Sequence, residues 1–280
     1  MAFIDSSLTP AFWRRLSQRW PPRMPALILI AAVFLSALSF WQLQTDHWEA
    51  AIRAFETEDR LRPPQPGRVV FVGSSSIRFW HTLAADMAPI PVLNRGFGGS
   101  RLHDILRYSD RIILPYQPRA VVVYGGENDL GGRWSRPETV LERFQRLVEH
   151  LRQTDPALPI LLLAIKPSPY YQQRLSQQVE ANQRLRAYCE ATPGLRFIDV
   201  ASPLLGADGR PRPELFQDGL HLNAAGYRLW RERVRPALLA ALDLNSESAG
   251  SGTAPAAGAA PKPLPSSAPA PRVNSLPPSP

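Results

Sequence analysis

Five short apolar runs, separated by longer helical stretches, constrain the fold of this chain more than any other feature of its sequence. Val, Ile and Leu dominate the runs, and the stretches between most of them are long enough to form helices. Strands that alternate with helices form a parallel sheet with helices on both faces. We therefore predict a three-layer α/β/α sandwich with a five-stranded parallel, flavodoxin-like sheet. The expected strands span residues 69–72, 90–93, 120–124, 160–165 and 196–200.

Helices are expected between these strands and at both ends of the domain. Before the first strand, Trp48, Ile52 and Phe55 lie on one stripe of an amphipathic helix, which we expect to cap the domain. The prolines that follow at residues 63, 64 and 66 would end this helix. The expected helices span residues 46–62, 77–88, 101–107, 137–154, 170–191 and 224–242.

The segment from Met24 to Thr45 contains no charged side chain and is mostly apolar. At about 1.5 Å per residue, a helix of this length crosses a hydrocarbon core of about 30 Å. Four arginines precede the segment, so the positive-inside rule places residues 1–23 in the cytoplasm and the rest of the chain outside it. We expect residues 24–45 to be a transmembrane signal-anchor and the domain to be periplasmic in a Gram-negative cell. The alternative is a signal peptide cleaved at the small residues around Ala37-Leu38-Ser39, which would release a secreted protein.

The two ends of the chain differ in composition from the part between them. Nine of the last 35 residues are proline, and most of the others are Ala, Ser and Gly. Such a segment buries too little apolar surface to offset the entropy of ordering it. We therefore expect residues 46–245 to form the globular domain and residues 246–280 to be a disordered tail.

Composition also limits the partners and cofactors that the chain can bind. The net charge is +8, but the part outside residues 1–43 and 246–280 has 26 basic and 22 acidic residues. No basic run or basic helix face stands out in that part, so we expect no nucleic-acid partner. Cys189 is the only cysteine, which excludes an intramolecular disulfide. The histidines other than His221 show no metal-ligand spacing, and we expect neither a metal nor another cofactor.

Four polar segments follow expected strands or precede the last expected helix. Each of them alone is ordinary turn chemistry, since Gly, Ser, Asn and Asp favour turns and helix caps. Together they bring a serine nucleophile, a histidine with an acid beside it, and further donors for an oxyanion to one edge of the sheet, as acyl transfer requires. The segments are Gly73-Ser-Ser-Ser76, Asn94-Arg-Gly-Phe-Gly-Gly99, Gly126-Glu-Asn-Asp129 and Asp218-Gly-Leu-His221.

These four blocks resemble, in order and spacing, those of the SGNH/GDSL hydrolases, especially bacterial esterase-like members. The resemblance covers residues 47–242. It implies Ser75 as nucleophile, His221 as base and Asp218 as the residue that orients it. It also implies an oxyanion hole formed by the Ser75 N–H, the Gly99 N–H and the Asn128 side chain. The family often has Asp between this Gly and Ser, where this chain has Ser74.

The expected activity is hydrolysis of a carboxylic ester of a small molecule, without a cofactor. Loops between the blocks are short and lack a long apolar insertion, which favours a short acyl group, such as acetyl, on a sugar or other small alcohol. A lysophospholipase or thioesterase-like acylhydrolase is the first alternative, because a membrane tether would place lipids nearby. An acyltransferase with the same triad, or a binding module that has lost activity, also fits the pattern. Protein partners are not predicted.

Overall fold

The computed structural model describes residues 27–36, 47–132 and 134–250 of the 280-residue chain. Its contacts divide the chain into a first compact unit, which ends at Leu242, and a second unit from Asp243 onward. The sheet, the helices around it and the polar blocks named above all belong to the first unit.

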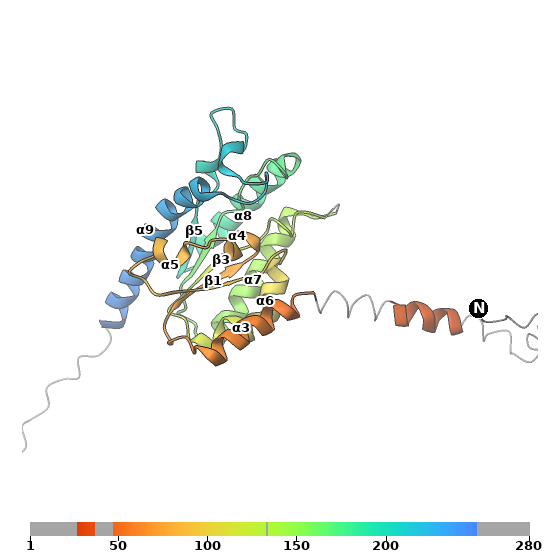
Figure 1. Ribbon diagram of the computed structural model, residues 1–280, viewed down its shortest axis with the longest axis horizontal. Coiled ribbons are helices and arrows are strands. Elements are labelled where there is room, and N and C mark those ends of the chain that lie inside the picture. The colour runs from red at the N-terminus through yellow and green to blue at the C-terminus, as the bar shows by residue number, and fades with distance from the viewer. Residues whose placement is uncertain (1–26, 37–46, 133, 251–280) are drawn as a thin grey trace, which may run out of the picture. The chain divides into compact units, whose positions relative to one another are not determined.

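A five-stranded, entirely parallel sheet forms the centre of the first unit (Figure 1). The strand order is β2-β1-β3-β4-β5, which confirms the predicted α/β fold with a flavodoxin-like sheet. The chain runs outward in opposite directions from β1 and β3, so a crevice forms beyond their carboxyl ends. The strands are β1 (Val69–Gly73), β2 (Val92–Gly96), β3 (Ala120–Tyr124), β4 (Ile160–Leu163) and β5 (Leu195–Ile198).

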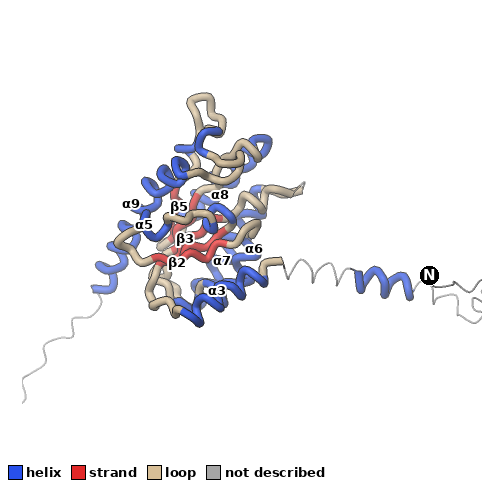
Figure 2. The backbone as a smooth tube through the Cα atoms, viewed as in Figure 1, coloured by secondary structure: helices blue, strands red, loops and turns tan. Residues whose placement is uncertain are grey.

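Helices cover both faces of the sheet, and Figure 2 shows the strands between them. Val70 and Val72 face one apolar cluster, whereas Val69 and Phe71 face the other. Burial on both faces explains why these strands are continuous apolar runs rather than alternating ones. The first cluster includes residues of α3 (Glu49–Leu61), α6 (Leu102–Ile112), α7 (Pro137–Thr154) and α8 (Leu175–Ala191); the second includes residues of α4 (Ser75–Arg78), α5 (Leu83–Asp86) and α9 (Ala224–Gly250).

The predicted helix over residues 77–88 is wrong, because this segment forms the two short helices α4 and α5. Trp80 lies between them and is buried against Phe71, Tyr227 and Trp230. Its indole N–H donates to the Asp86 carboxylate at 2.7 Å. The burial of this large ring interrupts the helix that local spacing alone predicts.

Several other boundaries differ from the prediction by a few residues, and two of these differences have a local reason. Strand β2 begins at Val92 rather than at residue 90, because Pro91 has no N–H to donate to a strand ladder. Helix α9 ends at Gly250, so residues 246–250 of the predicted tail are helical. No proline occurs between Pro236 and residue 255 to stop this helix earlier. The rest of the predicted tail lies outside the described residues.

The expected membrane segment lies largely outside the described residues. Residues 27–36 of it form a helix with exposed apolar side chains, and residues 24–26 and 37–45 are not described. Within the described ranges, no helix combines the length and apolar character needed to span a membrane.

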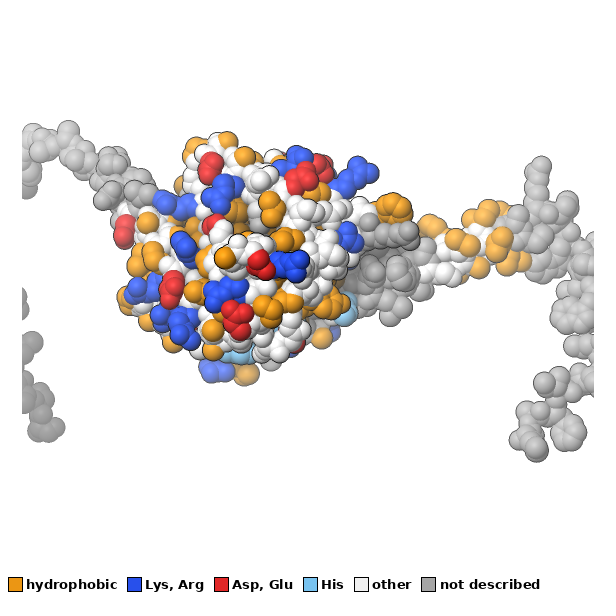
Figure 3. All heavy atoms as spheres, turned by 90° about the horizontal axis from the view of Figure 1, so that it is seen from above, with side chains coloured by type: hydrophobic (Ala, Val, Ile, Leu, Met, Phe, Trp, Pro, Cys, Tyr) orange, Lys and Arg blue, Asp and Glu red, His pale blue; other side chains and the backbone are white. Residues whose placement is uncertain are grey.

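Charged side chains of both signs are mixed over the surface. On the face drawn in Figure 3, basic and acidic side chains of the described residues lie beside one another. Some of them pair directly: Arg184 of α8, for example, contacts Glu180 of the same helix and Glu138 of α7. Such exposed pairs each contribute little to stability.

Candidate active site

Ser75 lies where β1 passes directly into α4, at the carboxyl edge of the sheet. The turn depends on Gly73, because a Cβ at that position would stand 2.4 Å from the backbone oxygen of Tyr124. Of the three serines in the turn, Ser74 and Ser76 are buried at 1% and 0% exposure, whereas Ser75 is half-buried. As the first residue of α4, Ser75 also has a backbone N–H without a partner inside the helix.

The segment that precedes α9 brings His221 to Ser75 across 146 residues of sequence. Nε2 of His221 lies 3.0 Å from Ser75 Oγ, and Nδ1 lies 2.6 Å from Asp218 Oδ2. A neutral imidazole that donates from Nδ1 to Asp218 leaves Nε2 free to accept the serine proton. The structure thus joins the three predicted residues in one hydrogen-bonded chain.

A tight turn holds Asp218 in place. Its Oδ1 accepts hydrogen bonds from the backbone N–H groups of Leu220 at 3.0 Å and His221 at 2.7 Å. Burial favours the neutral carboxyl, but hydrogen bonds from the His221 ring and these two N–H groups outweigh it. Together they lower the pKa of Asp218 to about 2. The carboxylate therefore stays charged near neutral pH.

Two contacts fix the distance between the histidine segment and the serine turn. The Phe79 ring, just after α4, meets the His221 ring edge-on with centroids 5.0 Å apart. The Tyr227 hydroxyl of α9 donates to the backbone oxygen of Ser76 at 2.9 Å. Phe79 thus packs against the catalytic histidine candidate, and Tyr227 holds α9 to the serine turn by a hydrogen bond. Neither residue belongs to the four sequence blocks.

The end of β2 and the glycine-rich loop that follows it (residues 97–99) lie beside α4. Asn94 donates from Nδ2 to the Ile77 oxygen at 2.7 Å and accepts from the Gly96 N–H at 2.9 Å. Gly96 permits this approach, since a Cβ there would be 2.3 Å from the Arg78 nitrogen. A Cβ on Gly98 would be 4.0 Å from Cβ of Ser75, and the following Gly99 has φ +77°. The predicted oxyanion donor Gly99 is thus part of a loop that lies beside the serine.

Asn128 lies in the loop after β3, half-buried beside the glycine-rich loop. Its Nδ2 donates to the Ser100 oxygen at 2.9 Å, which uses one of its two N–H bonds and orients the other. The neighbouring Asp129 fixes this loop by accepting from the backbone of Gly126 and Leu102 and from Arg143. The sequence block contains Asp129, but its role in joining two loops is visible only in the folded chain.

A buried ion pair lies beneath the Asn128 loop. Lys166, after β4, donates to Glu127 at 2.6 Å, and their side chains are 0% and 4% exposed. The Tyr124 hydroxyl donates to the other oxygen of Glu127 at 3.1 Å. Burial and the nearby Glu127 charge raise the pKa of Tyr124 well above its usual value. The pair connects the ends of β3 and β4 and thereby fixes the residue before Asn128.

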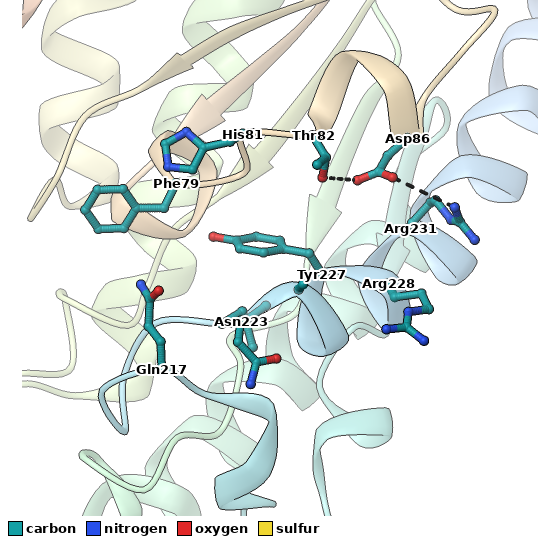
Figure 4. A pocket seen from close by; sticks show the side chains of 11 residues that line it. Phe79, His81, Thr82, Asp86, Gln217, Asn223, Tyr227, Arg228 and Arg231 are labelled. Carbon is teal, nitrogen blue, oxygen red and sulfur yellow. Dashed lines mark hydrogen bonds and ion pairs between the residues drawn. The ribbon is translucent and has the colours of Figure 1, made fainter.

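A cavity of about 550 Å³ lies beside the histidine segment (Figure 4). Phe79 and His81 line it from one side, Tyr227 and Arg228 of α9 from another, and Gln217 from the segment before Asp218. Ser75 and His221 are not among its lining residues. Phe79, which lines the cavity, also contacts the His221 ring.

Comparison with known proteins relates the chain to one group of hydrolases. A family model described as the GDSL-like lipase/acylhydrolase family matches residues 65–229, more than half of the chain. No curated protein sequence matches. A GDSL-like lipase from Bacteroides thetaiotaomicron is similar in structure, with a TM-score of 0.58 and 20% identity over 68% of this chain and 98% of that one.

Two other solved structures are similar to the same extent. A Streptococcus pneumonia protein described as a candidate platelet activating factor has a TM-score of 0.62 and 21% identity, over 74% of this chain and 99% of its own. A Bacteroides fragilis candidate acylhydrolase has a TM-score of 0.59 and 22% identity, over 66% of this chain and 94% of its own. At such identities these likenesses support the fold alone.

Proposed function

Since the chain belongs to the GDSL-like lipase/acylhydrolase family and is a hydrolase, we propose that it is a serine esterase with Ser75 as nucleophile. The observation that carries this proposal is the hydrogen-bonded chain from Asp218 through His221 to Ser75, with contacts of 2.6 and 3.0 Å. This is the arrangement in which a base activates a hydroxyl and a carboxylate stabilises the charge that the base acquires.

The proposed reaction has two half-reactions of the same kind. Nε2 of His221 takes the Ser75 proton while Oγ bonds to the carbonyl carbon of the ester. The resulting oxyanion collapses, the alkoxide leaves with the proton from His221, and an acyl-enzyme remains. Water then loses a proton to His221 and attacks the acyl carbon. The second oxyanion collapses and the bond to Ser75 Oγ breaks, so the acid is released while His221 returns the proton to Oγ. Asp218 stays ionised and stabilises the imidazolium in both half-reactions.

Three donors are proposed to bind the oxyanion: the Ser75 N–H, the Gly99 N–H and the Asn128 amide. The Ser75 N–H is at the N-terminus of α4, and Asn128 retains one N–H beyond the bond to Ser100. Donors of this kind act mainly in the transition state and are each worth about 3 kcal/mol.

A short acyl group, such as acetyl, on a sugar or other small alcohol is the proposed substrate. Between the strand ends and the following helices, the described residues contain no added helix long enough to form a lid. They contain only three-residue 3-10 helices: η2 (Gln172–Arg174), η3 (Ser202–Leu204) and η4 (Pro213–Leu215). A long acyl chain would need an extended apolar surface, at about 0.8 kcal/mol per methylene.

The enzyme is further proposed to act outside the cytoplasm, held to the membrane by residues 24–45. The support is in the sequence: four arginines precede an uncharged segment of 22 residues.

Replacement of the nucleophile tests the activity directly. Ser75→Ala is expected to abolish p-nitrophenyl acetate hydrolysis and fluorophosphonate labelling while the protein remains folded by circular dichroism. Ser74→Ala is the matched control and should retain most activity, because the Ser74 side chain is buried. Undiminished labelling of Ser75→Ala would assign the nucleophile to another residue.

A further inference from the structure

The indole of Trp48 makes a hydrogen bond that the reaction above does not use. Its Nε1–H donates to the carbonyl oxygen of Gly98 at 2.8 Å, across 50 residues of sequence. Trp48 directly precedes α3 and lies ahead of residue 65, where the family match begins. The contact joins the N-terminal end of the domain to the glycine-rich loop beside Ser75.

The carbonyl that Trp48 contacts belongs to the same peptide unit as the Gly99 N–H. In a trans peptide, the C=O and the next N–H point in opposite directions. Ala88-Pro89 is the only cis peptide among the described residues, so this unit is trans. A donor that fixes the Gly98 oxygen therefore also fixes the direction of the Gly99 N–H. That N–H has no hydrogen-bond partner within the described part of the chain, which leaves it available to a ligand.

This peptide unit needs an external restraint because both residues that flank it are glycine. Gly99 has φ +77°, and nothing lies within 4 Å of the place where its Cβ would be. Without side chains, rotation of the unit meets little steric resistance. Because the Gly99 N–H is proposed to bind the oxyanion, a rotated unit would direct the Gly98 carbonyl oxygen there, where it would repel the oxyanion instead of binding it.

Trp48 is itself held in place by the docking of α3. Its ring meets Phe97 edge-on at 6.3 Å, and Ile52, one turn further along, is fully buried. Glu49 and Glu56 of α3 both accept hydrogen bonds from Arg111 of α6. Because these contacts hold Trp48 in place, its indole N–H can orient the glycine-rich loop.

We propose that Trp48 is a positioning residue that holds the Gly98-Gly99 peptide with its N–H directed to the oxyanion. The inference rests on the proposed function, since this N–H has a catalytic use only if an oxyanion forms. It also assigns a functional contact to a part of the chain that lies between the expected membrane segment and the sheet.

The test compares two variants in the full-length protein. Trp48→Phe keeps an aromatic ring near Phe97 but removes the N–H. Its kcat for p-nitrophenyl acetate should fall about 10- to 100-fold with KM nearly unchanged, because the lost donor acts in the transition state. Its affinity for a trifluoromethyl ketone, which forms an oxyanion when Ser75 adds to it, should fall by a similar factor.

Tyr116→Phe is the matched control. It removes a hydroxyl of η1 (Leu114–Tyr116) that donates to Asp59, near the far end of α3, and accepts from Arg95 of β2. The change loosens the attachment of the helix but leaves the Trp48–Gly98 hydrogen bond in place. This variant should melt earlier but keep its kcat. An unchanged kcat and inhibitor affinity in folded Trp48→Phe would overturn the positioning role and leave the esterase intact. Equal losses of kcat in both variants would also overturn it. Absence of hydrolysis and labelling in the unmodified protein would overturn both proposals.

Discussion

At the residue scale, the position of a side chain in a turn determines which of several similar residues faces the reacting groups. Three consecutive serines follow Gly73, and two of them point into the protein. Ser75 alone meets His221, because it occupies the first position of α4. The turn at Asp218 also keeps this side chain negatively charged. Hydrogen bonds from the His221 ring and from two backbone N–H groups lower the pKa of Asp218 to about 2.

Asn128 provides a prediction at this scale. Asn128→Ala should lower kcat by roughly 10²- to 10³-fold with little change in KM, because an oxyanion donor acts mainly in the transition state. Steady-state kinetics with p-nitrophenyl acetate would measure both constants. Asn182→Ala is the control: that amide bonds the Ile165 backbone away from Ser75 and should leave kcat unchanged. A rise in KM alone for Asn128→Ala would mean that this amide only binds substrate.

At the scale of elements, ion pairs attach α3 to α6 and so position the residues at the start of α3. The Arg111 guanidinium donates to Glu49 at 2.9 and 3.0 Å and to Glu56 at 2.6 Å. Hydrogen bonds from Arg111, and then from Arg53, lower the pKa of Glu49 to about 2 from an ordinary 4.5. Because Trp48 directly precedes Glu49, this attachment also bears on the glycine-rich loop.

The lowered pKa predicts how the stability contribution of Glu49 depends on pH. A carboxyl whose pKa is depressed by folding stabilises the native state above its unfolded pKa, and this contribution is lost as pH falls toward about 2. Urea unfolding should show Glu49→Gln to be less stable than wild type at pH 7 by at most about 1 kcal/mol, since the pair is partly exposed. The difference should shrink below pH 4.5.

Glu149→Gln, at an exposed position of α7, is the control for this measurement and should change stability little at any pH. A Glu49→Gln variant whose deficit is the same at acid and neutral pH would show that the loss comes from packing rather than from charge.

At the scale of the whole molecule, the connections at the carboxyl edge of the sheet bear on which acyl chains fit, because in the described residues they contain no added helix long enough to form a lid. We expect kcat/KM to be highest for acetyl to butyryl p-nitrophenyl esters and to fall for longer chains. A chain-length series with the full-length protein would measure this, with Ser75→Ala as the blank for spontaneous hydrolysis. A steady rise toward long chains would favour a lysophospholipase or thioesterase-like enzyme.

The proposed membrane attachment also belongs to the whole molecule. A phosphatase that is active only outside the cytoplasm should be active when fused after Arg60, and the protein should fractionate with membranes. A reporter that requires the cytoplasm should stay dark at the same position; the reverse pattern would refute the proposed topology. A mature N-terminus near Phe40 would indicate a cleaved signal peptide instead.

The sequence by itself determined the class of fold and the residues that gather at the sheet edge. Strands buried on both faces must be continuous apolar runs, as in Val69–Gly73 and Ala120–Tyr124. Parallel strands also bring their carboxyl ends to one edge, so polar blocks that follow them in sequence meet in space. Both features, the apolar strand and the polar block directly after it, lie within a few residues of each other, so the local sequence is enough to predict them.

Tertiary structure alone decided the features that depend on contacts between distant segments. Burial of Trp80 against α9 divided the helix expected over residues 77–88. Asp129 gained its partners from the start of α6 and from α7, and Trp48 reached Gly98 only because α3 docks on α6. In each case the decisive partner lies more than ten residues away along the chain, where neither helix spacing nor turn composition specifies which side chain will be near.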